Sequence, residues 1–174
     1  NNWSNGFYEE NKKLPDKGLA VARMAAHITY LSKKGLQEKF GRKLQERDDL
    51  KFGFDADFQI ESYLRYQGSV FVDRFDANSY LHIVGMWQRF NLFKESGVSD
   101  MKTLLQRCRN QRYLIFSIDS DVCFYPDAQE EMARELKDAD VTCMRITVHS
   151  EKGHDSFLLE PELFTQHLAY SLKE

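Results

Sequence analysis

The stretch that decides the fold is Lys152–Leu158, which reads KGHDSFL. It follows an apolar run, Val141 to Val148, that is typical of a buried β-strand. A second apolar run of this kind, Tyr113 to Ile118, comes earlier, and a helical pattern, Asp127 to Lys137, lies between the two. The order strand, helix, strand predicts a β-α-β unit with parallel strands.

Acidic residues and a histidine follow the two predicted strands. Asp119 and Asp121 come after the first strand, and His154 comes after the second. Loops at the carboxyl ends of parallel strands converge on one crevice, so these side chains are expected near one another. A histidine that acts as general base needs an acid on its second ring nitrogen. On pattern alone either aspartate can be that acid, and an isolated Gly-His-Asp can also be an ordinary loop.

The order strand, acid, helix, strand, histidine matches the second half of an α/β-hydrolase catalytic triad, whose members follow as nucleophile, acid and histidine. The preceding part of the chain shows helical signals and no convincing strand. Two parallel strands cannot enclose a core, because such strands are normally buried on both faces. Helices are predicted over 18–32, 57–66, 70–75, 78–90 and about 100–109, with a break at Gly68. The polar segment over about 33–53 is predicted to be a solvated face or loop. Candidate N-caps are Asp76 or Asn78 and Ser99 or Asp100.

Composition excludes several classes of protein. A net charge of −3 gives no reason to expect nucleic acid as a partner. No apolar run approaches the roughly 20 residues of a membrane span, so no membrane partner is expected. Cys108, Cys123 and Cys143 form no C-x-x-C pair, which indicates neither a zinc site nor a disulfide framework. We therefore expect no metal, and three reduced cysteines in a cytoplasmic protein.

The first predicted helix carries three polar residues on one face. Arg23, His27 and Tyr30 stand at positions i, i+4 and i+7 of a mostly apolar pattern. Such residues either have structural partners or point into a polar cavity, and the spacing alone favours structural partners.

The sequence resembles the C-terminal part of the homoserine O-acetyltransferases, acyltransferases of the α/β-hydrolase superfamily, over nearly its whole length. The resemblance rests on six blocks in the family's order. They are Trp3–Tyr8, Lys17–Arg23 with Ala26–Tyr30, Lys39–Arg42, Glu61–Gly68, Arg74–Tyr80 and Gly153–Glu160.

The resemblance implies which residues are catalytic. The family's acid lies in a Ser-Asp-x-x-Phe-x-Pro context, which Ser120–Pro126 matches. It therefore implies that Asp121, and not Asp119, is the acid, and that His154 is the base.

The resemblance also implies the substrates and how they are held. The reaction is transfer of acetyl from acetyl-CoA to the hydroxyl of L-homoserine in methionine biosynthesis, by a ping-pong route with no cofactor beyond the co-substrate acetyl-CoA. The residues that match the family's homoserine contacts are Arg23, Tyr30 and Asp155. This reverses the structural interpretation of the helix face.

The implied fold class is α/β: the C-terminal part of an α/β-hydrolase fold, with two parallel strands and flanking helices, plus an all-helical lid. Residues 1–17 are expected to form a loop, 18–110 the lid and 111–174 the β-α-β-α part of the core. In the family the lid roofs the active site and forms much of a homodimer contact, so a cytoplasmic homodimer is expected.

Two features depart from the family pattern. Val122 and Cys123 follow the acid where the family often has an aromatic residue. No G-x-S-x-G occurs in the 174 residues, so the nucleophilic serine, the oxyanion-hole loop and the first strands are expected upstream of Asn1. The isolated chain is accordingly expected to be inactive and unstable, with apolar surface exposed around its strands.

Two alternatives remain at this point. One is a homoserine or serine O-succinyltransferase of the same fold, since the acyl donor is expected to be selected near the serine. The other is a non-catalytic helical dimerisation fragment, against which the joint presence of the five site residues argues.

Overall fold

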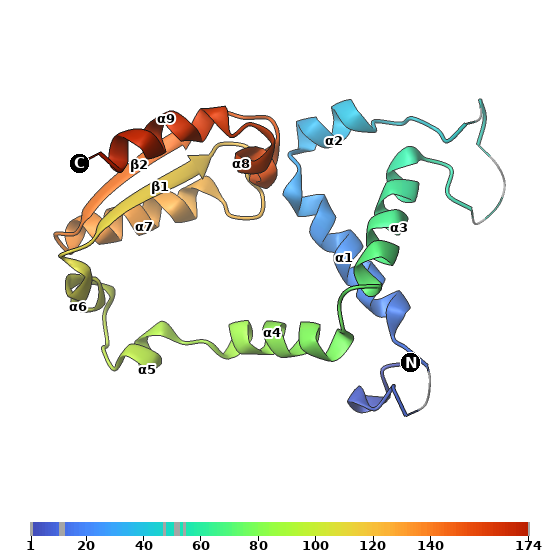
Figure 1. Ribbon diagram of the computed structural model, residues 1–174, viewed down its shortest axis with the longest axis horizontal. Coiled ribbons are helices and arrows are strands. Elements are labelled where there is room, and N and C mark those ends of the chain that lie inside the picture. The colour runs from blue at the N-terminus through green and yellow to red at the C-terminus, as the bar shows by residue number, and fades with distance from the viewer. Residues whose placement is uncertain (1, 11–12, 47, 51–52, 54, 174) are drawn as a thin grey trace. The chain divides into compact units, whose positions relative to one another are not determined.

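The computed structural model describes residues 2–10, 13–46, 48–50, 53 and 55–173. Contacts divide the chain into two compact units (Figure 1). The first consists of Asn1–Ile28 and Leu36–Arg89, and the second of Thr29–Gly35 and Phe90–Glu174. The division of the complete protein into a lid over 18–110 and a core over 111–174 stays a prediction.

The second unit is built around two strands. β1 (Arg112–Ile118) and β2 (Thr142–Val148) pair in parallel, with Arg112 opposite Thr142 and Ile118 opposite Val148. α7 (Pro126–Asp138) connects them and begins with a proline, which is pre-organised for the first helical turn. The predicted β-α-β unit is therefore confirmed.

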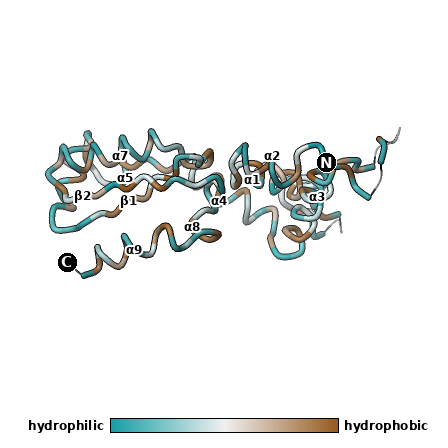
Figure 2. Tube along the Cα trace, turned by 90° about the horizontal axis from the view of Figure 1, so that it is seen from above, coloured by the Kyte–Doolittle hydropathy of each residue, from teal (hydrophilic) through white to brown (hydrophobic). Residues whose placement is uncertain are grey.

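Helices cover both faces of this sheet. Figure 2 shows α7 on one side of the strands and α9 (Glu162–Ser171) on the other. Successive side chains of a strand point to opposite faces. Ile115 accordingly packs in a cluster with Leu136 of α7, whereas Ile118 packs with Phe164 of α9. The two clusters fix the sheet between the helices.

Short helices flank the strands. α5 (Leu92–Ser96), α6 (Met101–Leu105) and η2 (Gln106–Cys108) lead into β1, whereas η3 (Gly153–Asp155) and α8 (Ser156–Leu159) follow β2. Asp100 caps α6, because its carboxylate accepts a hydrogen bond of 2.8 Å from the backbone N–H of Thr103. This selects Asp100 from the two predicted caps.

The first unit is helical. It contains η1 (Ser4–Gly6), α3 (Gln59–Val72), α4 (Ala77–Arg89) and most of α1 (Asp16–Tyr30), while α2 (Lys33–Lys39) begins in the second unit. Its core is a cluster of Tyr8, Leu19 and Ala77. Asp76 caps α4 by accepting from the backbone N–H of Ser79 at 2.7 Å. The predicted cap at Asp76 is thus confirmed.

Two local predictions about α3 were wrong. α3 continues through Gly68 to Val72, so neither the break nor a separate helix over 70–75 exists. A Cβ at Gly68 would lie 3.1 Å from the Cβ and the carbonyl oxygen of Ala20. The glycine therefore permits close helix contact. Residues 33–39, part of the segment predicted as a solvated face or loop, form α2, whose start is capped by the Ser32 hydroxyl accepting from the backbone N–H of Gly35.

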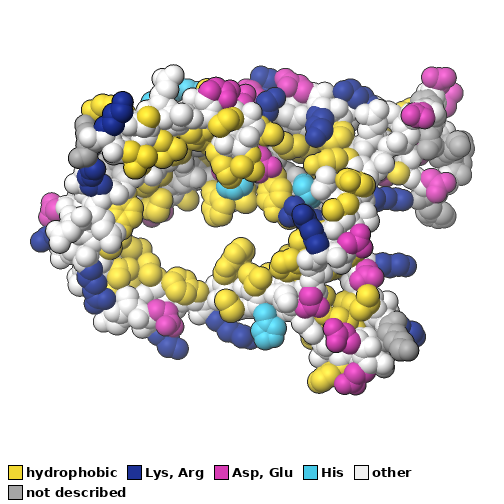
Figure 3. All heavy atoms as spheres, viewed as in Figure 1, with side chains coloured by type: hydrophobic (Ala, Val, Ile, Leu, Met, Phe, Trp, Pro, Cys, Tyr) yellow, Lys and Arg dark blue, Asp and Glu magenta, His cyan; other side chains and the backbone are white. Residues whose placement is uncertain are grey.

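Large apolar side chains are exposed on the second unit, where they appear at its surface in Figure 3. Met144 of β2 is among them, as are Phe157 and Leu158 after β2. This agrees with the expected apolar surface around the strands. Within the described ranges, no helix combines the length and apolarity that crossing a membrane needs.

Candidate active site

The side chains of Asp121 and His154 meet beyond the carboxyl ends of β1 and β2. His154 Nδ1 lies 2.9 Å from Asp121 Oδ2. The aspartate side chain is 2% exposed and the histidine side chain 26% exposed. With a proton on Nδ1 directed at the carboxylate, Nε2 keeps a lone pair that can accept a proton from a nucleophile. The pair therefore has the geometry of a general base and its orienting acid.

Local backbone geometry holds the carboxylate of Asp121. Its Oδ1 accepts hydrogen bonds from the backbone N–H groups of Cys123 and Phe124, at 2.8 and 2.9 Å. These contacts use the oxygen that does not face His154. They need only backbone donors, so Val122 and Cys123 can replace an aromatic residue without moving the acid.

The turn that carries His154 depends on a glycine. Gly153 has φ of +71°, a left-handed conformation that side chains disfavour. Aromatic rings then surround the imidazole, with centroids of Phe124 at 5.1 Å, Phe157 at 5.8 Å and Tyr30 at 6.5 Å. These rings confine the imidazole, whose side chain is nevertheless partly exposed.

Hydrogen bonds from serine hydroxyls hold the same turn. Ser120 Oγ donates to the carbonyl of Ser150 at 2.5 Å and accepts from the backbone N–H of Gly153 at 3.0 Å. Ser150 Oγ donates to Glu160 Oε2 at 2.5 Å, and the buried Ser156 hydroxyl lies 2.8 Å from Ser150 Oγ. The network joins the end of β1 to the histidine turn and to the residue after α8.

The other aspartate has a histidine of its own. Asp119 Oδ2 lies 2.7 Å from His149 Nδ1, and Oδ1 accepts from the backbone N–H of Ser150 at 3.2 Å. Partial burial raises the pKa of Asp119, but the hydrogen bonds from His149 and Ser150 outweigh it, so its pKa lies below the usual value. Both members are exposed, at 43% for Asp119 and 82% for His149. Asp119 thus forms an exposed pair with His149 at the surface.

Tyr30 and Asp155 both lie beside His154. Tyr30 ends α1 within the second unit, with its ring tilted toward the imidazole. Asp155 follows His154 directly in η3 and is partly exposed, and its carboxylate forms no hydrogen bond or ion pair with any described residue. Two of the three predicted homoserine contacts are therefore grouped with the histidine.

Arg23 belongs to the first unit, and only its surroundings there are described. Its guanidinium carbon lies 5.1 Å from the centroid of the Phe71 ring, a cation–π contact. Phe71 packs in turn against the cluster of Tyr8, Leu19 and Ala77. The aromatic ring of Phe71 thus holds the guanidinium within the first unit.

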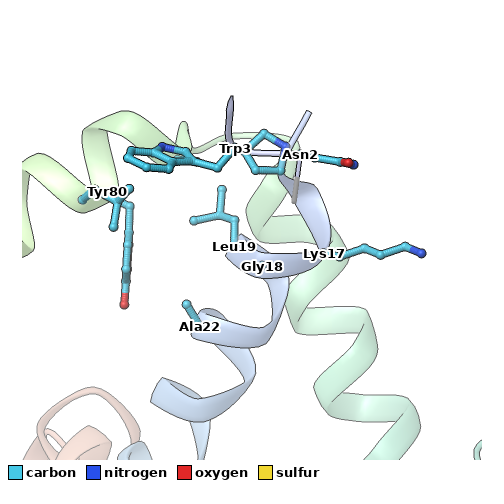
Figure 4. Close-up of a pocket in the computed structure, with 10 residues that line it drawn as sticks. Asn2, Trp3, Lys17, Gly18, Leu19, Ala22 and Tyr80 are labelled. Atoms are coloured by element: carbon cyan, nitrogen blue, oxygen red, sulfur yellow. The ribbon is translucent and has the colours of Figure 1, made fainter. Parts of the chain in front are cut away.

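A sizeable cavity lies among residues of the first unit. It has a volume of about 560 Å³. In Figure 4, Trp3 and Tyr80 flank Leu19 and Ala22, whereas Lys17 points away from them. The ten described residues that line it include no histidine and no acid. Asp121 and His154, and not the lining of this cavity, are therefore the candidates for acid–base chemistry.

Sequence reasoning did not single out the supporting serines. Ser120 lies in the motif Ser120–Pro126 and Ser156 in Lys152–Leu158, yet no sequence pattern predicts which hydroxyl reaches which carbonyl. Among the described residues there is no group of three or more His, Cys, Asp or Glu side chains able to hold a metal ion. A reaction without a metal stays a prediction.

No protein-family model matches the chain. It is 55% identical over 172 residues to homoserine O-acetyltransferase of Pelagibacter ubique, covering 99% of the chain and 46% of that relative. Identity to the enzyme of the same name from Caulobacter vibrioides is 52% over 159 residues, 91% of the chain and 41% of the relative. Identity to homoserine O-acetyltransferase of Mesorhizobium japonicum is 48% over 169 residues, which cover 93% of the chain and 41% of that relative.

Solved structures agree on the fold. Homoserine O-acetyltransferase from Bacillus anthracis matches with a TM-score of 0.77 at 16% identity, covering 95% of this chain and 43% of that one. Esterase E22 matches with a TM-score of 0.76 at 18% identity, with 95% and 44% covered. The chain thus has part of an α/β-hydrolase fold and spans less than half the length of the relatives and structures it matches. It is a homologue of the C-terminal part of the homoserine O-acetyltransferases.

Proposed function

We propose that the complete protein containing this chain is a homoserine O-acetyltransferase that acts in methionine biosynthesis. The observation that carries the proposal is the buried Asp121 carboxylate bonded to Nδ1 of His154. The names of the similar proteins support the substrates, acetyl-CoA and L-homoserine.

In the first half-reaction, His154 Nε2 removes the proton from a serine hydroxyl supplied by the rest of the complete protein. The serine oxygen attacks the thioester carbon of acetyl-CoA, and the CoA thiolate leaves and takes the proton from the imidazolium. Asp121 keeps the imidazole in the required tautomer and stabilises its protonated form.

In the second half-reaction, homoserine binds to the acetyl-enzyme. Arg23 pairs with its carboxylate, Asp155 with its ammonium group, and Tyr30 adds a polar contact. His154 takes the proton from the homoserine hydroxyl, which attacks the acetyl ester. The serine oxygen leaves and recovers that proton, and the product is O-acetylhomoserine.

The same proposal covers partners and location. We expect no cofactor besides the co-substrate, no metal, no nucleic acid and no membrane partner. The likeness of residues 18–110 to the family's lid supports a homodimer through those helices. A biosynthetic reaction on cytosolic metabolites supports a cytoplasmic location.

The test uses the complete protein with four pairs of substrates: acetyl-CoA or succinyl-CoA as donor, and homoserine or serine as acceptor. Release of free thiol measures the rate, and mass spectrometry identifies the product. We expect acetyl-CoA and homoserine to give the highest kcat/KM. Preference for succinyl-CoA would replace the proposal by its succinyltransferase alternative, and absence of transfer with every pair would refute it.

A further inference from the structure

We propose that Ser32 is a positioning residue that locks the histidine turn to the end of α1, so that the base His154 and the acceptor contact Tyr30 move as one body. The inference rests on the proposed function. It concerns residues of the second unit alone, because Thr29–Gly35 groups there with the strands and not with the remainder of α1.

The Ser32 side chain bridges two turns that are far apart in sequence. Its hydroxyl donates to the carbonyl oxygen of Glu151 at 2.5 Å and accepts from the backbone N–H of Gly35 at 2.9 Å. Ser32 is buried, so solvent does not compete for these bonds. The neighbouring ion pair of Lys34 and Glu151 is exposed on both sides, and such pairs contribute little. The buried hydroxyl is therefore the specific link.

Two glycines bring the backbones into direct contact around this link. A Cβ at Gly153 would lie 2.6 Å from the backbone nitrogen of Ser32 and 3.0 Å from the carbonyl oxygen of Tyr30. A Cβ at Gly35 would lie 3.0 Å from the carbonyl oxygen of Glu151. Neither turn can carry a side chain at these positions without shifting. The two turns therefore pack with their backbones in contact, and the hydrogen bond from Ser32 to Glu151 joins them.

The consequence for the reaction is specific. His154 works in both half-reactions, whereas Tyr30 contacts only the amino-acid acceptor. Loss of the Ser32 hydroxyl frees both residues from one another, so it lowers kcat and raises KM for homoserine together. A residue needed only for folding would reduce the amount of active enzyme and leave KM unchanged.

The experiment compares Ser32→Ala with Ser96→Ala in the complete protein. Ser96 is a matched control, because its hydroxyl also donates to a backbone carbonyl, that of Leu92, at 2.5 Å, but in α5. Active sites are counted from the burst of CoA released by acetyl-CoA. We expect Ser32→Ala to lose roughly tenfold in kcat per active site, with KM for homoserine raised several-fold. Values within twofold of the parent, as expected for Ser96→Ala, would overturn the proposal.

A second measurement keeps this proposal separate from the proposed function. Hydrogen exchange of the peptide over 151–154 should be faster in Ser32→Ala than in the parent and in Ser96→Ala, whether or not the protein transfers acetyl groups. Unchanged exchange would refute the lock even in an active enzyme. If Ser32→Ala fails to fold, Gly35→Ala crowds the same contact, and unaltered exchange and kinetic constants in that variant would equally refute it.

Discussion

Two aspartate–histidine pairs lie beyond the carboxyl ends of β1 and β2. They consist of the same residue types but differ in solvent exposure and in backbone support. The distance in the Asp119–His149 pair is 2.7 Å, shorter than the 2.9 Å between Asp121 and His154. Yet the side chains of Asp119 and His149 are 43% and 82% exposed. Those of Asp121 and His154 are only 2% and 26% exposed. The distances alone would not favour Asp121 and His154 as the catalytic pair. Burial favours them, because water screens an exposed pair and competes for its hydrogen bonds.

Support from the backbone is the second difference. Asp121 is held by two backbone N–H groups, and His154 is confined by aromatic rings and by the Gly153 turn. His149 carries its ring into solvent. A base must hold its geometry through a reaction, so the rigid pair suits catalysis and the exposed pair suits a surface ion pair.

Replacing each histidine tests the comparison with the largest expected effect. His154→Ala in the complete protein should lower kcat by about 10⁵–10⁶-fold, because the only base in the proposed mechanism is lost. His149→Ala should remain within about twofold, as expected of an exposed ion pair. Steady-state acetyl transfer to homoserine measures both. Similar losses in the two variants would mean that the second pair also serves the reaction.

Gly153→Ala should break one pair and leave the other intact. The substitution combines a left-handed φ of +71° with a Cβ 2.6 Å from Ser32 N, so the turn must move. We expect kcat to fall by about 10²-fold. Gly97→Ala is the control, since φ is +69° there but no atom lies within 4 Å of the added Cβ. It should cost about 1–2 kcal/mol of stability and spare activity. Equal activity in both variants would contradict the account.

A third variant extends the comparison from the base to the acceptor. Arg23→Ala should weaken use of homoserine by roughly tenfold to a hundredfold, as expected for a charge-assisted hydrogen bond. Acetylation of the enzyme by acetyl-CoA should change little, since it precedes homoserine. Arg42→Ala is the control, because Arg42 lies over Phe58 at 5.3 Å much as Arg23 lies over Phe71. Equal damage to both half-reactions by Arg23→Ala would indicate a structural arginine.

The smallest expected effect concerns pH and the exposed pair. The pKa of Asp119 is lower in the folded protein than the usual value of about 3.9, so its contribution to stability is present above that pH. It is lost as pH falls through the lower folded pKa. Urea midpoints of the parent and Asp119→Asn should therefore differ slightly at pH 7 and converge as the pH falls through the folded pKa of Asp119. A difference that grew on acidification would contradict this sign.

The sequence predicted the features that depend on short-range pattern. Apolar runs located β1 and β2, and a helical period located α7. Pattern alone left Asp119 and Asp121 open, and the choice of Asp121 rested on the resemblance to the family. The break predicted at Gly68 was wrong, because a glycine that breaks a helix and one that admits a neighbouring helix look alike in sequence. The contact with Ala20 makes the difference, and it forms only on folding.

Long-range hydrogen bonds could not be predicted. The Ser32–Glu151 bond joins residues separated by 119 positions, and the bond from Ser120 to Ser150 spans 30. A serine is suitable for a cap, a turn or a buried bridge, so its identity does not specify a distant partner. These contacts position the histidine turn, and only the folded chain reveals them.

The most direct test of the central claim is single-turnover acetylation of the complete protein by acetyl-CoA, with Asp121→Asn and Asp119→Asn compared in parallel. An asparagine keeps the shape of the acid but no longer fixes the histidine tautomer or stabilises the imidazolium. We predict a loss of about 10³–10⁴-fold in the acetylation rate for Asp121→Asn and less than about threefold for Asp119→Asn. A larger loss for Asp119→Asn would contradict the assignment of Asp121 and His154 as the catalytic pair.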